Sequence, residues 1–69
     1  MKIPKEGDKF FTGFETEFDQ FGEILIVTEV EGIIEDGKGN EGRTITCSDG
    51  IGYDCFWSEK NQHFVYGLD

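Results

Sequence analysis

Few side chains in this sequence could bind a metal ion or act as a nucleophile. Seven residues separate Cys47 from Cys55, and His63 follows eight positions later. Structural zinc sites use four ligands and closely spaced cysteine pairs, a pattern that three ligands at these spacings do not meet. His63 is also the only histidine available to activate either thiol. We therefore expect neither a metal site nor a cysteine nucleophile.

The glycine-rich segment from Asp36 to Gly42 is superficially similar to a calcium-binding loop. An EF-hand loop that began at Asp36 would need an oxygen ligand at its third position, glycine at its sixth and glutamate at its twelfth. This sequence has Lys38, Glu41 and Cys47 at those positions. The segment is therefore predicted to be a mobile loop between two strands, and we expect no cofactor.

Carboxylate pairs are the remaining possibility for catalysis, because two carboxyl groups can act as general acid and general base. Fifteen of the 69 residues are acidic, so some pair will lie at a suitable distance by composition alone. The chain is also short for enclosing a substrate pocket, which typically needs roughly 300–1,000 Å³. The sequence predicts no catalytic residue and a protein that is not an enzyme.

The excess of acidic residues limits the classes of partner. Fifteen acidic and six basic residues give a net charge of −9, so we expect no direct binding to nucleic acid and no attraction to an anionic membrane. The longest apolar run, Ile24–Val27, is too short to cross a bilayer, and the first residues lack the apolar stretch of a secretory signal. The expected location is the cytoplasm, and the expected partner is a basic protein surface. The alternative is that the charge only confers solubility.

The alternation of apolar and polar residues predicts a single small β domain over residues 1–69. Five strands are expected, at residues 10–18, 23–34, 43–48, 53–57 and 63–68. The fold class is mainly β, as a five-stranded, strongly bent antiparallel sheet or a small barrel. The order of the strands resembles that of SH3-like barrels. A competing interpretation places one short helix at residues 15–22 or 57–62.

The long second strand and the hairpin after it give the most specific structural expectations. The first half of the second strand is apolar on both faces and is expected to be central in the sheet, with a bend at Gly32. In the hairpin, a three-residue loop that ends in a left-handed Gly52 would place Cys47 opposite Cys55 and Ile45 opposite Trp57. A cytoplasmic location favours two free, buried thiols, and a disulfide between opposed strands is the alternative.

Acidic residues follow the alternation of the predicted strands. From Phe10 to Gly37 the chain has eight acids and no base. Five of these acids are expected on strand faces as contacts to a partner: Glu15, Glu17, Asp19, Glu29 and Glu31. Alternate residues of a strand are about 6.6 Å apart, which is on the scale of a nucleic-acid backbone. The hypothesis is that these rows occupy a basic groove meant for DNA or RNA, and the alternative is a solvated strand face.

The ten aromatic residues exceed what one small barrel is expected to bury. Phe11, on the acidic face of the first strand, and Phe21, in a turn, are predicted to stay exposed, together with one of Tyr53, Trp57 and Tyr66. Exposed aromatic side chains within a charged rim are typical of protein-binding hot spots. Phe11 and Phe21 are therefore candidate anchors, and the alternative is that every ring folds inward.

In size, acidity and aromatic content the chain resembles small proteins that phages use to disable host nucleic-acid machinery or defence systems. That class includes DNA-mimic, anti-restriction and anti-CRISPR proteins. The resemblance implies the cytoplasm of a host bacterium and a nucleic-acid-binding host protein as partner. The predicted function is a non-enzymatic acidic module that docks on a basic protein surface and inhibits or modulates it. The second hypothesis is a structural or assembly subunit of a larger complex or virion, which would suit a homo-oligomer.

Overall fold

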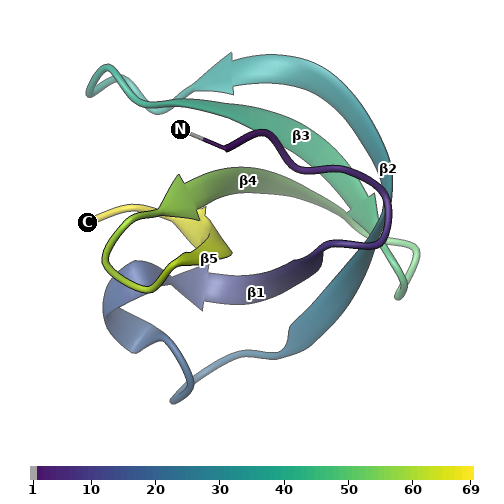
Figure 1. Cartoon of the computed structure of the whole chain (residues 1–69), viewed down its shortest axis with the longest axis horizontal. Coiled ribbons are helices and arrows are strands. Elements are labelled where there is room, and N and C mark those ends of the chain that lie inside the picture. The colour runs from purple at the N-terminus through teal and green to yellow at the C-terminus, as the bar shows by residue number, and fades with distance from the viewer. Residues whose placement is uncertain (1) are drawn as a thin grey trace.

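The computed structural model describes residues 2–69, which form a closed barrel of five strands (Figure 1). The elements are β1 (Lys9–Phe14), the 3-10 turn η1 (Glu15–Glu17), β2 (Ile24–Glu35), β3 (Glu41–Cys47), β4 (Gly52–Ser58) and β5 (His63–Gly67). The prediction of a mainly β fold with five strands is confirmed. Among the described residues, no helix is long and apolar enough to span a membrane.

The barrel closes because its last strand pairs with its first. Strands that are consecutive in the chain pair antiparallel, whereas β1 and β5 pair parallel, with Phe10 beside Phe64 and Phe11 beside Val65. In a ring of five strands that alternate in direction, the first and last must run the same way. The ring therefore has four antiparallel pairings and one parallel pairing, the one that closes the barrel. Closure pairs the strand edges that would otherwise be open to aggregation.

The inward-facing side chains of all five strands fill the barrel. The core consists of Phe10, Val27, Ile45, Cys47, Cys55 and Phe64. Both cysteines are buried free thiols, which confirms the first of the two alternatives. Burial raises the pKa of the Cys47 thiol to about 11 and that of the Cys55 thiol to about 12. Both thiols therefore stay protonated at neutral pH and pack as small apolar groups.

Two irregularities in β2 change which of its side chains face the core. The pairing with β3 shifts register between Val27 and Glu29, and again between Val30 and Ile33. An extra residue in one strand reverses the alternation of faces. Val27 and Val30 consequently both pack on the core, although simple alternation puts them on opposite faces.

The outward face of β2 is open at its start, and the strand bends where expected. Ile24 and Ile26 are 44% and 41% exposed, although β2 pairs with β1 on one edge and with β3 on the other. The second register shift includes Gly32, and β2 curves strongly around the barrel in Figure 1. The Gly32 amide donates to Thr44 Oγ1 at 2.9 Å, which satisfies this donor inside the irregularity.

The β3–β4 hairpin has a different register from the predicted one. Ile45 pairs with Tyr53 rather than Trp57, and Arg43 rather than Cys47 lies opposite Cys55. The prediction assumed the shortest loop compatible with a glycine at its end. The turn is instead centred two residues earlier, at Asp49 rather than Ile51, so the partner of each residue moves by four positions and each side chain keeps its face.

Side-chain hydrogen bonding within the loop stabilises the turn at Asp49 and Gly50. The left-handed residue is Gly50, at φ 80°, and not Gly52 as predicted. Asp49 Oδ1 accepts a hydrogen bond from the Ile51 amide at 3.0 Å, a local turn that aspartate forms readily. Gly52 is consequently the first residue of β4, where its missing side chain leaves space on the barrel surface.

The first strand ends at Phe14, four residues before its predicted end. The Phe14 amide donates to Glu17 Oε1 at 3.2 Å, so a side chain satisfies a donor that a longer ladder would have paired. The alternative of a short helix within residues 15–22 is confirmed as the single turn η1, whereas residues 59–62 form a turn. In Figure 1 the chain turns back at η1 before it enters β2.

Candidate binding groove

Glu15 is bound within the fold and is not a free surface charge. Its carboxylate accepts hydrogen bonds from Ser58 Oγ at 2.7 Å and from the Asp69 amide at 3.2 Å, and its carbonyl accepts one from Asn61 Nδ2 at 2.8 Å. The Asp69 carboxylate in turn accepts hydrogen bonds from the amide and hydroxyl of Thr16. Glu15 therefore connects η1 with the turn after β4 and with the last residue of the chain.

Glu17 and Asp19 also lie outside any strand. Glu17 accepts the hydrogen bond from the Phe14 amide. Asp19 is exposed in the turn after η1 and has a left-handed φ of 68°, which aspartate tolerates better than most residues. The predicted row of Glu15, Glu17 and Asp19 on one strand face is wrong, because the extended backbone ends before the first of them.

The chain after β1 covers a small second core on the outside of the barrel, termed here the covered corner. Phe11 is 1% exposed, and its ring meets that of Phe18 edge-on with centroids 5.2 Å apart. Val65, which pairs with Phe11, and Ser58, which donates to Glu15, are fully buried in the same region. The prediction that Phe11 is an exposed anchor is wrong, because the turn after β1 folds over it.

The other predicted contact residues are exposed. Phe21 is 70% exposed. Glu29 and Glu31 lie exposed on the outward side of β2, and Glu31 Oε2 accepts a hydrogen bond from Thr46 Oγ1 at 2.8 Å. Of the three aromatic residues that were alternatives for exposure, Tyr66 has 38% of its surface exposed. Glu31 and Tyr66 line the same hollow on the barrel surface.

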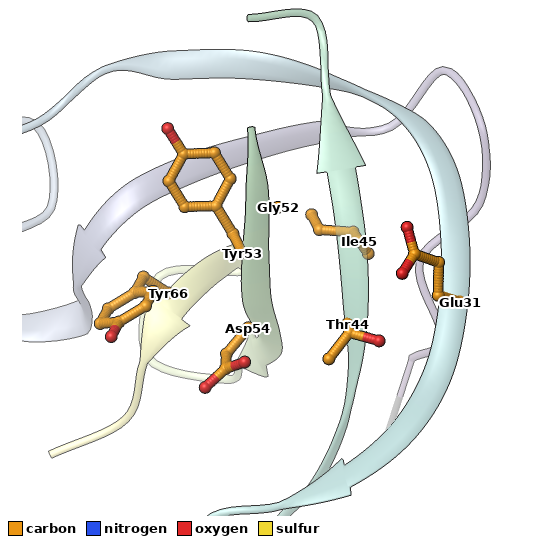
Figure 2. A pocket seen from close by; sticks show the side chains of 7 residues that line it. All are labelled: Glu31, Thr44, Ile45, Gly52, Tyr53, Asp54 and Tyr66. Atoms are coloured by element: carbon orange, nitrogen blue, oxygen red, sulfur yellow. The ribbon is translucent and has the colours of Figure 1, made fainter. Parts of the chain in front are cut away.

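Two hollows that share Asp54 and Tyr66 form what we term the Asp54 groove. The first has a volume of about 380 Å³ and is lined by Glu31, Thr44, Ile45, Gly52, Tyr53, Asp54 and Tyr66 (Figure 2). The second has a volume of about 390 Å³, and its lining includes Phe14, Ile34, Glu35, Asp36, Lys38, Phe56 and Leu68. Both hollows thus combine acidic residues with aromatic and apolar ones, and the second also includes a lysine.

Four strands contribute to the first hollow. In Figure 2, Tyr53 and Tyr66 stand at one side and Glu31 at the other, with Asp54 and Thr44 between them. Asp54 and Thr44 are paired residues of β4 and β3. Strand register therefore fixes the proximity of these two side chains.

Gly52 keeps the first hollow open. A Cβ atom built on Gly52 would meet a single heavy atom within 4 Å, the carbonyl oxygen of Ile45 at 3.6 Å. That distance is an ordinary van der Waals contact, and Gly52 does not have a left-handed φ. A side chain at this position would therefore occupy the hollow without a backbone clash.

Hydrogen bonding fixes the side chain of Tyr53, which packs against the barrel core. The Tyr53 hydroxyl donates to Asp49 Oδ2 at 2.6 Å. This hydrogen bond is the main reason why the pKa of Tyr53 is raised to about 12, and burial adds to it. The same bond, with a second from the Ile51 amide, lowers the pKa of Asp49. Tyr53 consequently stays neutral at physiological pH.

The carboxylates of the groove differ in how far they are engaged. Asp36 accepts hydrogen bonds from Asn40 Nδ2 at 2.8 Å and from the Lys38 amide at 2.8 Å, and these lower its pKa. Asp54 and Glu35 are exposed, and within residues 2–69 neither carboxylate accepts a hydrogen bond or forms an ion pair. These two acids remain available to an external cation.

Sequence reasoning did not single out Asp54, because a lone acid between Tyr53 and Cys55 forms no visible charge pattern. The signal was the outward face of β4, where alternation puts Gly52, Asp54 and Phe56 in one row. That row combines a missing side chain, an acid and an aromatic ring. Its meaning depends on the neighbouring strands, which the sequence does not specify.

The groove offers carboxylates, aromatic faces and apolar area. Within residues 2–69, no group of three or more histidine, cysteine, aspartate or glutamate side chains is arranged to hold a metal ion. No protein-family model, curated protein or solved structure matches the chain. The groove is therefore the basis for the functional proposal.

Proposed function

We propose that this protein is a non-enzymatic binding module whose Asp54 groove docks on a basic surface of a partner protein and so inhibits or modulates that partner. The observation that carries this proposal is the presence of free carboxylates beside exposed aromatic and apolar side chains in one groove. Carboxylates steer a basic partner, and aromatic anchors supply contact area. The net charge of −9 favours the same class of partner at longer range.

The proposed contact surface differs from the rows of acids expected from the sequence. It keeps Glu31, which is exposed on β2 and lines the groove, whereas Glu29 is exposed on β2 outside the groove and stays a candidate contact. It excludes Glu15 and Glu17, because their carboxylates already accept hydrogen bonds within the chain. Phe21 is exposed in the turn after η1 and stays a candidate contact outside the groove.

The finer part of the proposal concerns the identity of the partner. Proteins that handle DNA or RNA carry basic grooves that fit phosphates, and an acidic module of this kind would compete for such a groove. A phage-encoded inhibitor of host nucleic-acid machinery or of a defence system would act in this way in the bacterial cytoplasm. The support for this part is the charge of the chain and the acids of the groove.

Affinity capture from a bacterial lysate, at low and at high salt with identification by mass spectrometry, tests this function. The groove variant Glu35→Lys/Asp54→Lys is compared with the control Glu6→Lys/Glu23→Lys, which changes the net charge equally at exposed positions that do not line the groove. We expect a basic protein to be retained at low salt by the wild type and the control, and about tenfold less by the groove variant. Failure of the wild type to retain any basic protein contradicts the proposed function, and equal retention by both variants contradicts the groove.

Assembly into a larger structure is the second candidate function. It is favoured by three exposed isoleucines of β2: Ile24, Ile26 and Ile33 are 44%, 41% and 69% exposed. Exposed apolar side chains on a strand can pack against another copy. Light scattering coupled to size exclusion distinguishes the two functions, because a defined oligomer at low micromolar concentration supports assembly and a monomer supports the binding module.

A further inference from the structure

The first hollow of the Asp54 groove is suited to one cationic side chain rather than to a whole ligand. Its volume of about 380 Å³ lies near the lower end of the roughly 300–1,000 Å³ found for small-molecule pockets. Its lining includes two acids, Asp54 and Glu31, and Tyr66, whose ring is partly exposed, and no basic residue. The chemistry of the hollow is thus complementary to a cation with a flat, polarisable face.

Resting on the proposed function, we infer that this hollow receives an arginine side chain from an extended segment of the partner protein. The guanidinium group lies against the ring of Tyr66, with Asp54 and Glu31 as its counter-ions. This assignment names the residue type that the partner must present. It also separates the first hollow from the second hollow, which takes a neighbouring side chain of the same segment.

The aromatic side of the site is held in place before binding. The Tyr66 ring packs edge-on against Phe14, with centroids 5.5 Å apart at 81°, and keeps 38% of its surface exposed. A cation that stacks on Tyr66 therefore meets a ring whose orientation is already set, which lowers the entropic cost of binding.

The acidic side of the site is available to a donor. Asp54 is exposed and has neither a hydrogen-bond donor nor a cation within residues 2–69. Glu31 uses Oε2 to accept from Thr46, which leaves its other oxygen open. Two carboxylates at the rim offer several acceptors, and the five N–H donors of a guanidinium group can use more of them than the three of an ammonium group.

Arginine is preferred to lysine for a second reason. The guanidinium group is planar and weakly hydrated, so it can stack on an aromatic ring while it donates in its own plane to carboxylates. The adjoining hollow, lined by Phe14, Phe56 and Leu68, would hold an apolar side chain nearby on the same segment. The expected recognition element is therefore an arginine close to an apolar residue in an extended chain.

Titration with synthetic peptides, followed by NMR amide shifts, tests the inference directly. The probe is a nine-residue peptide with one central arginine and one nearby leucine, and the matched probes replace arginine by lysine or by citrulline, which is isosteric and neutral. We expect the arginine peptide to shift the amides of Gly52, Asp54 and Tyr66. The lysine peptide should bind about threefold more weakly and the citrulline peptide at least about tenfold more weakly.

Two variants locate the effect in the hollow. Gly52→Tyr fills the space where a Cβ has room, and Asp54→Asn removes the free charge at an exposed position. Each is expected to weaken binding of the arginine peptide by about tenfold or more, while the spectrum of the unbound protein stays that of the folded barrel. Glu23→Gln is the control and should bind as the wild type does.

Three results would overturn the inference: amide shifts that lie away from the groove, equal binding of the citrulline peptide, or wild-type affinity in both variants. Equal binding of the lysine peptide would overturn the choice of arginine. Any of these could occur while a basic protein is still captured from the lysate in a salt-dependent way. The failure of this inference is therefore distinct from the failure of the proposed function, in which no basic protein is captured.

Discussion

Glu15 in the covered corner and Asp54 in the groove are both carboxylates on the outside of the same barrel, and they differ in what surrounds them. Glu15 accepts hydrogen bonds from Ser58 Oγ and the Asp69 amide, and it belongs to the internal structure. Asp54 faces an open hollow next to Gly52 and Tyr66, with no donor from the described residues. The covered corner thus uses its acid for stability, and the groove leaves its acid free for a partner.

The difference between the two regions depends on the path of the chain beside each strand. After β1 the chain turns through η1 and folds back over Phe11, whereas nothing folds over the outward face of β4 at Gly52. A carboxylate under a turn finds donors inside the chain, and one beside a glycine in an open sheet does not. Residue type and net charge therefore do not tell which acids can bind a partner.

The largest expected effect separates two phenylalanines of the same region. Phe11→Ala should reduce the free energy of unfolding by about 3–4 kcal/mol, because it empties a packed site in which the ring is 1% exposed. Phe21→Ala should change it by no more than about 0.5 kcal/mol, since that ring is 70% exposed. Urea denaturation measures both values. Similar losses for the two variants would contradict the division into covered and exposed rings.

The two carboxylates give the next largest contrast. Glu15→Ala should cost about 2 kcal/mol of stability, because the buried Ser58 hydroxyl and the Asp69 amide lose their acceptor. Asp54→Ala should change stability by less than about 0.5 kcal/mol. Chemical denaturation of the two variants in parallel is the measurement. An unchanged free energy of unfolding in Glu15→Ala would mean that the Glu15 carboxylate contributes no more to stability than that of Asp54.

Two glycines extend the comparison to backbone packing. A Cβ at Gly13 would lie 2.8 Å from the Phe21 carbonyl oxygen and 2.8 Å from the Phe11 ring, so Gly13→Ala should cost about 1–3 kcal/mol. Gly52→Ala should be neutral or stabilise by up to about 1 kcal/mol, because it removes a flexible residue from a strand with space to spare. Thermal and urea unfolding test the signs, and a destabilised Gly52→Ala would show that the hollow is closed.

The smallest effect concerns the pKa of Asp49, an acid in the loop between β3 and β4. The Tyr53 hydroxyl is the main cause of the lowered pKa of Asp49, so Tyr53→Phe should raise that pKa toward its ordinary value of 3.8. A lowered pKa in the folded state adds stability above the unfolded-state pKa, which is lost as the pH falls through the folded-state pKa. As the pH is lowered, the free energy of unfolding should therefore fall less in Tyr53→Phe than in the wild type.

Carboxyl NMR titration reads the Asp49 pKa, with Asp36 as the internal control. The pKa of Asp36 is lowered by Asn40 and the Lys38 amide, so it should not respond to Tyr53→Phe. An unchanged pKa of Asp49 in the variant would show that the Tyr53 hydroxyl does not stabilise the Asp49 carboxylate by a hydrogen bond.

Sequence reasoning predicted the positions of the strands better than it predicted which residues lie beside them. Alternation and turn residues predicted five strands and a bend at Gly32, and these were confirmed. It misplaced Phe11 and the pairing of Cys55, because burial of an outward ring and the register of a hairpin depend on chain segments several residues away. Glu29 and Glu31 were expected on an outward face and lie there, although two irregularities in β2 alter the faces around them.

The sequence by itself determined the strand content, the negative charge and the absence of a recognisable catalytic motif, because period-two patterning, composition and ligand spacing are local properties. Tertiary structure decided that β5 closes on β1, that Glu15 and Phe11 are enclosed, and that Asp54, Tyr66 and Glu31 meet at one hollow. These outcomes depend on which strand lies beside which, and on where a turn folds back over the sheet. The physical reason is that contacts between strands are set by register and closure, which no single segment encodes.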